Sequence, residues 1–128
     1  MERRYSRQRE TIYQAVLASR AHPTAEMVYQ QLKPEMPRLS LGTVYRNLSL
    51  MTGAGEVRRI TVPEHPDRYD GDVSPHDHLL CMKCKKLFDI GSVGVDLKKS
   101  DIPTGTLVLG YEVTVKTICP ACAGAESK

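Results

Sequence analysis

Two Cys-x-x-Cys pairs place the strongest limit on what this chain can fold into. Cys81 and Cys84 form the first pair, Cys119 and Cys122 form the second, and 34 residues separate them. Each pair can form a tight turn that directs two thiolates at one point, and two pairs complete a tetrahedral zinc site. A redox-active motif would need only one pair, and a set of buried thiols is the other alternative. We therefore expect a structural Zn²⁺ ion that joins two distant segments.

Composition and charge narrow the class of protein further. The 128 residues are 41% hydrophobic and 26% charged, which is ordinary for a globular protein. No apolar run suits a signal peptide or a membrane span, so we expect a cytoplasmic protein with no membrane partner and no resting disulfides. Residues 1–62 hold ten Lys/Arg and five Asp/Glu (+5), whereas residues 63–128 hold eight and ten (−2). A basic first half favours a polyanionic partner, although a chance imbalance on a solvated surface gives the same count.

The basic half has the pattern of three short helices. Ser6 and Ser40 are candidate N-caps, and a further helix is expected to start at Thr24; apolar residues at helical spacing follow each of the three. The prolines within residues 34–37 end the second helix, and the glycines within residues 53–55 end the third. Residues 56–62 then have the pattern of a strand, with which residues 68–73 can pair.

The third helix and the strand after it carry the candidate DNA contacts. One face of the helix is an apolar stripe, made of Leu41, Val44, Leu48 and Met51. The face opposite is expected to hold Thr43, Arg46, Asn47 and Leu50, with Tyr45 on its flank. Three helices followed by a basic β-ribbon is the order of a winged helix-turn-helix, in which the third helix enters the major groove. The alternative is a small three-helix domain that binds no nucleic acid. We expect base reading by Tyr45 and Arg46, and phosphate contacts by Arg58 and Arg59.

The second half has a different pattern. Residues 77–90 indicate a strand, a turn and a strand, residues 95–99 a short helix, and residues 107–118 an extended segment. The linker is expected near residues 63–67. The fold class is therefore α+β, with a boundary between residues 66 and 67.

A second group of candidate metal ligands stands beside the first cysteine pair. On a strand, His76 and His78 face the same way while Asp77 faces away. Asp89 lies on the return strand, and Asp70 lies on the chain that leads out of the ribbon. Imidazoles and carboxylates without a thiolate suit Fe²⁺, Mn²⁺ or Zn²⁺. Exposed histidines without a ligand are the alternative, but two at alternate positions beside a zinc site favour a metal.

Taken in order, these segments resemble the ferric uptake regulator (Fur) family of metal-dependent repressors. The resemblance is carried by His22–Glu26, Gly42–Leu48, Arg68–Asp70, His76–Cys84 and Cys119–Cys122. It implies a homodimer with an N-terminal winged-helix DNA-binding domain (1–66) and a C-terminal α/β dimerisation domain (67–128) that holds structural Zn²⁺ on its four cysteines. It also implies a regulatory Fe²⁺ or Mn²⁺ ion, with the ligands His22, Asp70, His76, His78 and Asp89. His22 enters only through the resemblance, because the residue pattern alone indicates a turn there.

Asp89 directs the resemblance toward the peroxide-sensing (PerR-type) branch, because iron-sensing members usually have Glu at this position. In that branch Fe²⁺ reacts with peroxide and a histidine ligand is oxidised, a role that matches His22 and His76. Arg46 is instead typical of the iron-sensing branch, so a plain iron, manganese or zinc regulator is the alternative. Tyr111 stands where some members have the histidine of a further metal site, which we expect to be absent or altered.

These observations predict a repressor that binds double-stranded operator DNA when its metal is bound, with peroxide as a signal and no other small-molecule substrate. It is not expected to be an enzyme. A metallohydrolase would use His76, His78 and Asp89 around a catalytic ion, but the chain has no obvious spare carboxylate or pocket-forming segment. A zinc-stabilised RNA-binding module is a third alternative, which the scarcity of aromatic residues for base stacking disfavours.

Overall fold

The structure, a computed structural model, describes residues 2–19 and 21–126 of the chain. The chain forms two compact units that divide between Ser74 and Pro75. Three α-helices and a two-stranded ribbon make up the first unit, and a three-stranded sheet with a terminal helix makes up the second. The predicted α+β class is therefore confirmed. Within the described part of the chain, every helix is too short or too polar to serve as a membrane span.

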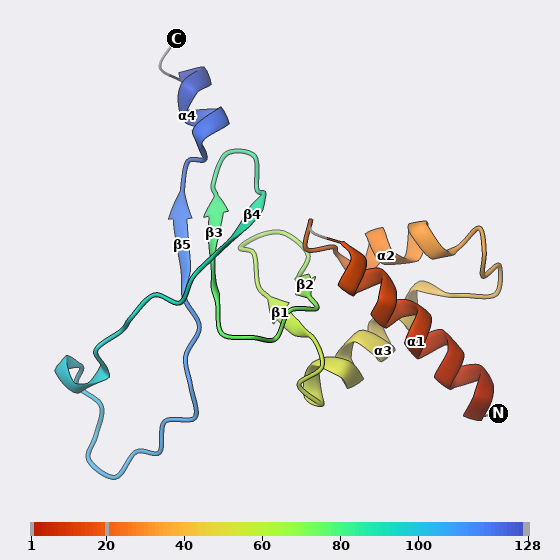
Figure 1. Cartoon of the computed structure of the whole chain (residues 1–128), viewed down its shortest axis with the longest axis horizontal. Coiled ribbons are helices and arrows are strands. Elements are labelled where there is room, and N and C mark those ends of the chain that lie inside the picture. The colour runs from red at the N-terminus through yellow and green to blue at the C-terminus, as the bar shows by residue number, and fades with distance from the viewer. Residues whose placement is uncertain (1, 20, 127–128) are drawn as a thin grey trace. The chain divides into compact units, whose positions relative to one another are not determined.

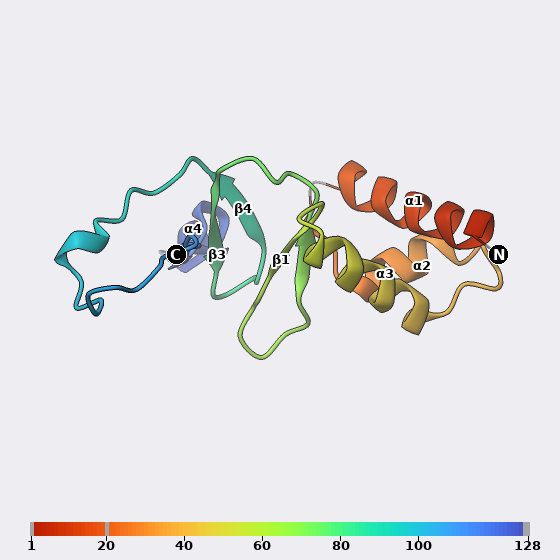
Figure 2. The ribbon, with the colours of Figure 1, turned by 90° about the horizontal axis from the view of Figure 1, so that it is seen from below.

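The helices of the first unit are α1 (Glu2–Ala18), α2 (Ala25–Leu32) and α3 (Leu41–Gly53). They pack against one another in pairs, as Figure 1 and Figure 2 show from two directions. Apolar side chains of the three helices, with Leu39 from the segment before α3, form one buried core that includes Ile12, Val16, Val28, Val44, Leu48 and Met51. The apolar stripe predicted for α3 thus faces the core, with Leu41 half-buried at its start.

Hydroxyl side chains cap α2 and α3; the cap at Ser40 was predicted, whereas at Thr24 only the start of a helix was predicted. The Thr24 Oγ1 atom accepts a hydrogen bond from the backbone N of Met27 at 3.1 Å. The Ser40 Oγ atom accepts one from the backbone N of Thr43, also at 3.1 Å. The cap predicted at Ser6 is wrong, because α1 begins at Glu2 and Ser6 lies within it. No glycine or proline in residues 2–5 interrupts the helix upstream of Ser6.

The ribbon of the first unit is formed by β1 (Arg58–Ile60) and β2 (Arg68–Asp70), which are shorter than predicted. They pair antiparallel, with Arg59 opposite Tyr69. The predicted boundary between residues 66 and 67 would separate these two strands. It falls inside the first unit, because β2 pairs with β1 and contacts α1.

In the second unit, the central strand β3 (Asp77–Cys81) pairs with β4 (Leu87–Ile90) antiparallel and with β5 (Thr114–Thr117) parallel. A long excursion that contains the 3₁₀ helix η1 (Leu97–Lys99) joins β4 to β5, and the short helix α4 (Pro120–Glu126) follows β5 (Figure 1). The predicted strand–turn–strand over 77–90 is confirmed. The extended segment predicted over 107–118 becomes a strand only at residues 114–117, and α4 was not predicted.

Candidate metal centres and nucleic-acid interface

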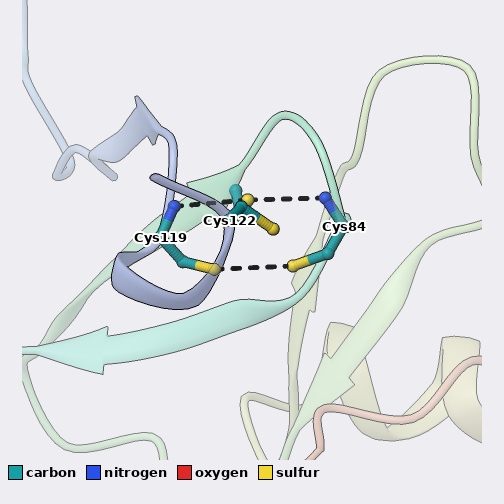
Figure 3. Close-up of side chains that lie close together, drawn as sticks. Cys84, Cys119 and Cys122 are labelled. Atoms are coloured by element: carbon teal, nitrogen blue, oxygen red, sulfur yellow. Dashed lines mark hydrogen bonds between the residues drawn. The ribbon is translucent and has the colours of Figure 1, made fainter. Parts of the chain in front are cut away.

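The four cysteines come together in the second unit. Cys81 ends β3, Cys84 follows in the turn to β4, Cys119 precedes α4 and Cys122 lies within it. Parallel pairing sets Cys81 beside Thr117, which brings the second cysteine pair next to the first. The four Sγ atoms all lie within 4.8 Å of one another, and those of Cys84 and Cys119 are 3.8 Å apart (Figure 3). All four are free thiols, so the cluster supplies the donor set of a tetrahedral zinc site.

Backbone N–H groups favour the thiolate at Cys81. Its Sγ atom accepts hydrogen bonds from the backbone N of Cys84 at 3.4 Å and of Cys119 at 3.3 Å. These bonds lower the pKa of Cys81 to about 5. Hydrogen bonding to Cys119 instead raises the pKa of Cys122 to about 12. A divalent cation at the centre of the cluster would counteract this rise in the pKa of Cys122, because a thiol that coordinates a metal ion is deprotonated. The cluster therefore fits a cation such as Zn²⁺.

Two histidines and one aspartate form a second group in the same unit. Register pairing places His78 directly opposite Asp89, and the His76 and His78 rings meet edge-on with centroids 4.7 Å apart. The Asp89 Oδ1 atom lies 3.3 Å from His78 Nε2 and 3.5 Å from His76 Nε2. The prediction that both histidines face one way is confirmed. Two imidazole nitrogens and a carboxylate oxygen at one point are donors that Fe²⁺, Mn²⁺ or Zn²⁺ accepts.

His22 and Asp70 form a third group, within the first unit. The segment before α2 lies along β2: the backbone N of Tyr69 donates to Pro23 O at 2.9 Å, and Arg68 Nη1 donates to His22 O at 3.2 Å. This pairing holds His22 in a left-handed conformation (φ 54°) and sets its Nε2 atom 3.4 Å from Asp70 Oδ2. Both side chains are buried. The residue pattern gave no indication that His22 is a candidate metal ligand, because its partner Asp70 is 48 residues away in the sequence.

Gly71, which follows Asp70, is required by close packing. A Cβ atom at Gly71 would lie 2.6 Å from Leu17 Cδ2 and 3.1 Å from Leu17 Cα. We expect Gly71→Ala to lower the free energy of unfolding by about 1–3 kcal/mol, because the α1 backbone cannot easily yield. Urea denaturation measures this. Gly53→Ala is the control, since nothing lies within 4 Å of a Cβ there. Equal stability of Gly71→Ala and the wild type would contradict the packing argument.

The exposed side of α3 differs from the prediction at one residue. Tyr45 and Arg46 are exposed and Thr43 is half-buried, so these three lie outside the core. Asn47 is only 8% exposed, and its Nδ2 atom donates to Thr43 O at 2.9 Å. Position 47 lies three residues after Val44 and four before Met51, which places it on the inward face. The structure therefore puts Asn47 with the core residues and not on the outer face.

The two arginines of β1 have different surroundings. Arg58 is half-buried, whereas Arg59 is exposed. Arg59 Nη2 donates to Ser49 Oγ of α3 at 3.2 Å, and its Nε atom lies 3.7 Å from Asp67 Oδ2. Its guanidinium carbon lies 5.9 Å from the centre of the Tyr69 ring. Arg59 thus links the ribbon to the outer side of α3.

Comparison with known proteins gives a consistent family. The profile of the "Ferric uptake regulator family" matches residues 1–115. The peroxide-responsive repressor PerR of Staphylococcus epidermidis is 36% identical over 86 residues, which cover 67% of this chain and 57% of that protein. PerR of Staphylococcus aureus is 35% identical over 86 residues, which cover 67% and 58%. The matched part of the chain therefore spans less than two thirds of these relatives.

Two solved structures match nearly the whole chain. The Campylobacter jejuni peroxide stress regulator is 27% identical with a TM-score of 0.75, covering 94% of this chain and 93% of that one. The Helicobacter pylori ferric uptake regulator Fur is 19% identical with a TM-score of 0.74, covering 91% and 80%. The second likeness shows the fold alone.

Proposed function

Because the chain belongs to the ferric uptake regulator family, we propose that it is a metal-dependent transcriptional repressor that binds operator DNA as a homodimer. The observation that carries the proposal is the approach of the His76 and His78 Nε2 atoms to one oxygen of Asp89, within 3.5 Å. This histidine–aspartate group is separate from the four thiols. The chain therefore has one donor set for a structural ion and a different donor set for an exchangeable regulatory ion.

Zn²⁺ held by the four cysteines is proposed to be structural. A site closed by four protein ligands leaves no open position for a substrate, which suits a structural role. The ion would tie the turn after β3 to the start of α4. Cys84 and Cys119, which it would join, are 35 residues apart.

The regulatory ion is proposed to be Fe²⁺ or Mn²⁺, held by His22 and Asp70 together with His76, His78 and Asp89. The sharing of one ion by these two groups is inferred from the family resemblance. Each group taken alone supplies at least one imidazole and one carboxylate. Metal and DNA that favour the same conformation raise each other's affinity by the same factor. Loss of the ion, or of one ligand, would then release the operator.

Peroxide is proposed as the signal. The relatives named as PerR and the peroxide stress regulator of C. jejuni support this reading, and so does Asp in place of Glu at position 89. Bound Fe²⁺ would supply the electron that reduces peroxide next to the metal ligands. His22 and His76 are the ligands proposed to gain the oxygen. The exposed Arg46, typical of the iron-sensing branch, supports a plain metal-level regulator as the second candidate.

The DNA surface is proposed to consist of the exposed side of α3 and the ribbon. Tyr45 and Arg46 would read bases, Thr43 would contribute at the start of the helix, and Arg58 and Arg59 would contact phosphates. Asn47 is left out of the proposed DNA contacts. Its buried side-chain amide donates a hydrogen bond to the helix backbone, which suits a structural role.

Arg46→Ala is expected to weaken binding to the preferred DNA by about 1–3 kcal/mol, with little effect on random DNA, because a bidentate arginine distinguishes bases. Arg58→Ala should weaken both and flatten the salt dependence. The probe is a duplex selected from a random pool by the Mn²⁺-loaded wild type, and fluorescence anisotropy measures its affinity.

Arg7→Ala is the matched control, since it removes an exposed arginine from α1. It should leave the ratio of specific to random affinity unchanged. An unchanged ratio in Arg46→Ala would show that α3 does not read the sequence.

A further inference from the structure

The excursion between β4 and β5 has no core of its own. It leaves the sheet after Ile90 and returns at Thr114 (Figure 1). No residue from 91 to 112 is buried, and Leu107 and Leu109 are 83% and 92% exposed. Apolar burial therefore contributes little to holding this segment, and the links at its two ends decide how well it is ordered.

Both ends of the excursion are held by one buried carboxylate. Asp77, the first residue of β3, is only 5% exposed. Its Oδ2 atom accepts a hydrogen bond from the backbone N of Val93 at 2.7 Å, and its Oδ1 atom accepts one from the backbone N of Val113 at 3.2 Å. An ionised carboxylate accepts at both oxygens, and such bonds are stronger than those between neutral groups. Asp77 thus closes the base of the excursion.

The two histidines proposed to bind metal flank Asp77, with His76 just before β3 and His78 within it. Asp77 lies between His76 and His78, whose rings meet on the side of the strand facing Asp89. The backbone N of His78 donates to Val113 O at 3.3 Å. Val113 is therefore bonded through its N–H to the Asp77 side chain and through its carbonyl to the His78 backbone. An ion that fixes both imidazoles would restrict the backbone from which Asp77 projects.

We propose that Asp77 is a positioning residue that transmits metal occupancy at His76 and His78 to residues 91–113, so that metal binding orders this segment. The inference rests on the proposed function in one respect, namely that the histidine pair binds a divalent ion. Because coupling is reciprocal, a partner or condition that orders the segment would raise the affinity for the ion. The apolar side chains of the excursion would then be presented in a fixed arrangement only when the metal is bound.

Hydrogen exchange of the full-length, zinc-loaded protein, with and without saturating Mn²⁺, tests the inference. We expect Mn²⁺ to slow exchange at the Val93 and Val113 amides of the wild type by about fivefold or more, the worth of about one hydrogen bond. Asp77→Asn should lose most of this slowing, because one acceptor becomes an NH₂ donor that faces an N–H group. Asp96→Asn is the control: it removes a charge from the same excursion, where Asp96 accepts from the backbone N of Lys98.

Electron paramagnetic resonance of Mn²⁺ on the same samples reports binding, with His78→Ala as the reference for loss of the site. Slowing in the wild type and Asp96→Asn but not in Asp77→Asn supports the inference. The inference is overturned if the wild type binds Mn²⁺ but its Val93 and Val113 amides exchange no more slowly. It is also overturned if Asp77→Asn binds Mn²⁺ and shows the full slowing; in both cases the proposed function stands. Equal Mn²⁺ binding by the wild type and His78→Ala overturns both. Where Asp77→Asn folds poorly, absence of slowing in the Mn²⁺-loaded wild type still overturns the inference.

Discussion

Cys81→Ser is expected to abolish zinc binding and unfold the second unit. Among the described residues of this unit, the buried ones are few: Asp77, His78, Leu80, Cys81, Leu87 and Cys119. Two leucines and two cysteines cannot supply a core that outweighs the entropy of ordering such a segment. Structural Zn²⁺ contributes roughly 10–16 kcal/mol in small metal-dependent domains, which is as large as the whole stability of a typical domain. We therefore expect the cooperative thermal transition of this unit to disappear, with monomerisation of any dimer.

Elemental analysis for zinc and thermal unfolding followed by circular dichroism measure this effect. Val115→Ser is the matched control, because it places serine on the neighbouring strand β5 at a side chain that is 37% exposed. The control should keep one zinc ion per chain and unfold within a few degrees of the wild type. A zinc-free Cys81→Ser protein with wild-type thermal stability would refute the structural role of the cluster.

Mild peroxide is expected to release DNA from the Fe²⁺-loaded protein but not from the Mn²⁺-loaded protein. The oxidant would form next to the imidazole ligands, so peptides containing His22 or His76 should gain a single oxygen atom. Asp89 is one methylene shorter than Glu, which changes the distance and angle at which its carboxylate reaches an ion. Its side chain is 53% exposed, so this side of the histidine group is open to a small solute. Asp89→Glu should bind the metal yet resist the oxidation.

Fragment-ion mass spectrometry, which assigns the added oxygen to one residue of a peptide, distinguishes this local damage from general oxidation. Met27, which is 41% exposed, serves as the internal control because solution peroxide reaches it directly. Its oxidation should be equal in the Fe²⁺ and Mn²⁺ samples. Retention of DNA by the Fe²⁺-loaded wild type, with no added mass on either histidine, would favour the plain metal-level regulator.

Local sequence patterns predicted those parts of the fold that depend on short-range physics. Ser40 caps α3 because a side-chain oxygen beside the first turn meets a free backbone N–H. His76 and His78 share a face because strand side chains alternate. The parallel pairing of β3 with β5, which brings the second cysteine pair to the first, was not predicted; a shared zinc site required only that the two pairs converge.

The features that the sequence did not predict depend on long-range partners. The contact between His22 and Asp70 follows from the pairing of Pro23 with Tyr69, which no local pattern encodes. The extended residues 107–112 form no strand, because β3 begins at Asp77 and its register pairs His78 with Thr114. α4 was missed because the second Cys-x-x-Cys pair was expected to form a tight turn, although Pro120 stands where proline is favoured, as the first residue of a helix.

Measuring the affinity of the zinc-loaded protein for its selected duplex, with and without Mn²⁺, shows whether a bound metal controls DNA binding. Fluorescence anisotropy should show that Mn²⁺ tightens binding by about 5–150-fold, the usual range for coupled sites. His78→Ala should retain zinc and bind the duplex equally with and without Mn²⁺, because it removes an imidazole 3.3 Å from Asp89 and leaves the four thiols intact. Equal affinity of the wild type for the duplex in the presence and absence of Mn²⁺ would contradict metal-dependent DNA binding.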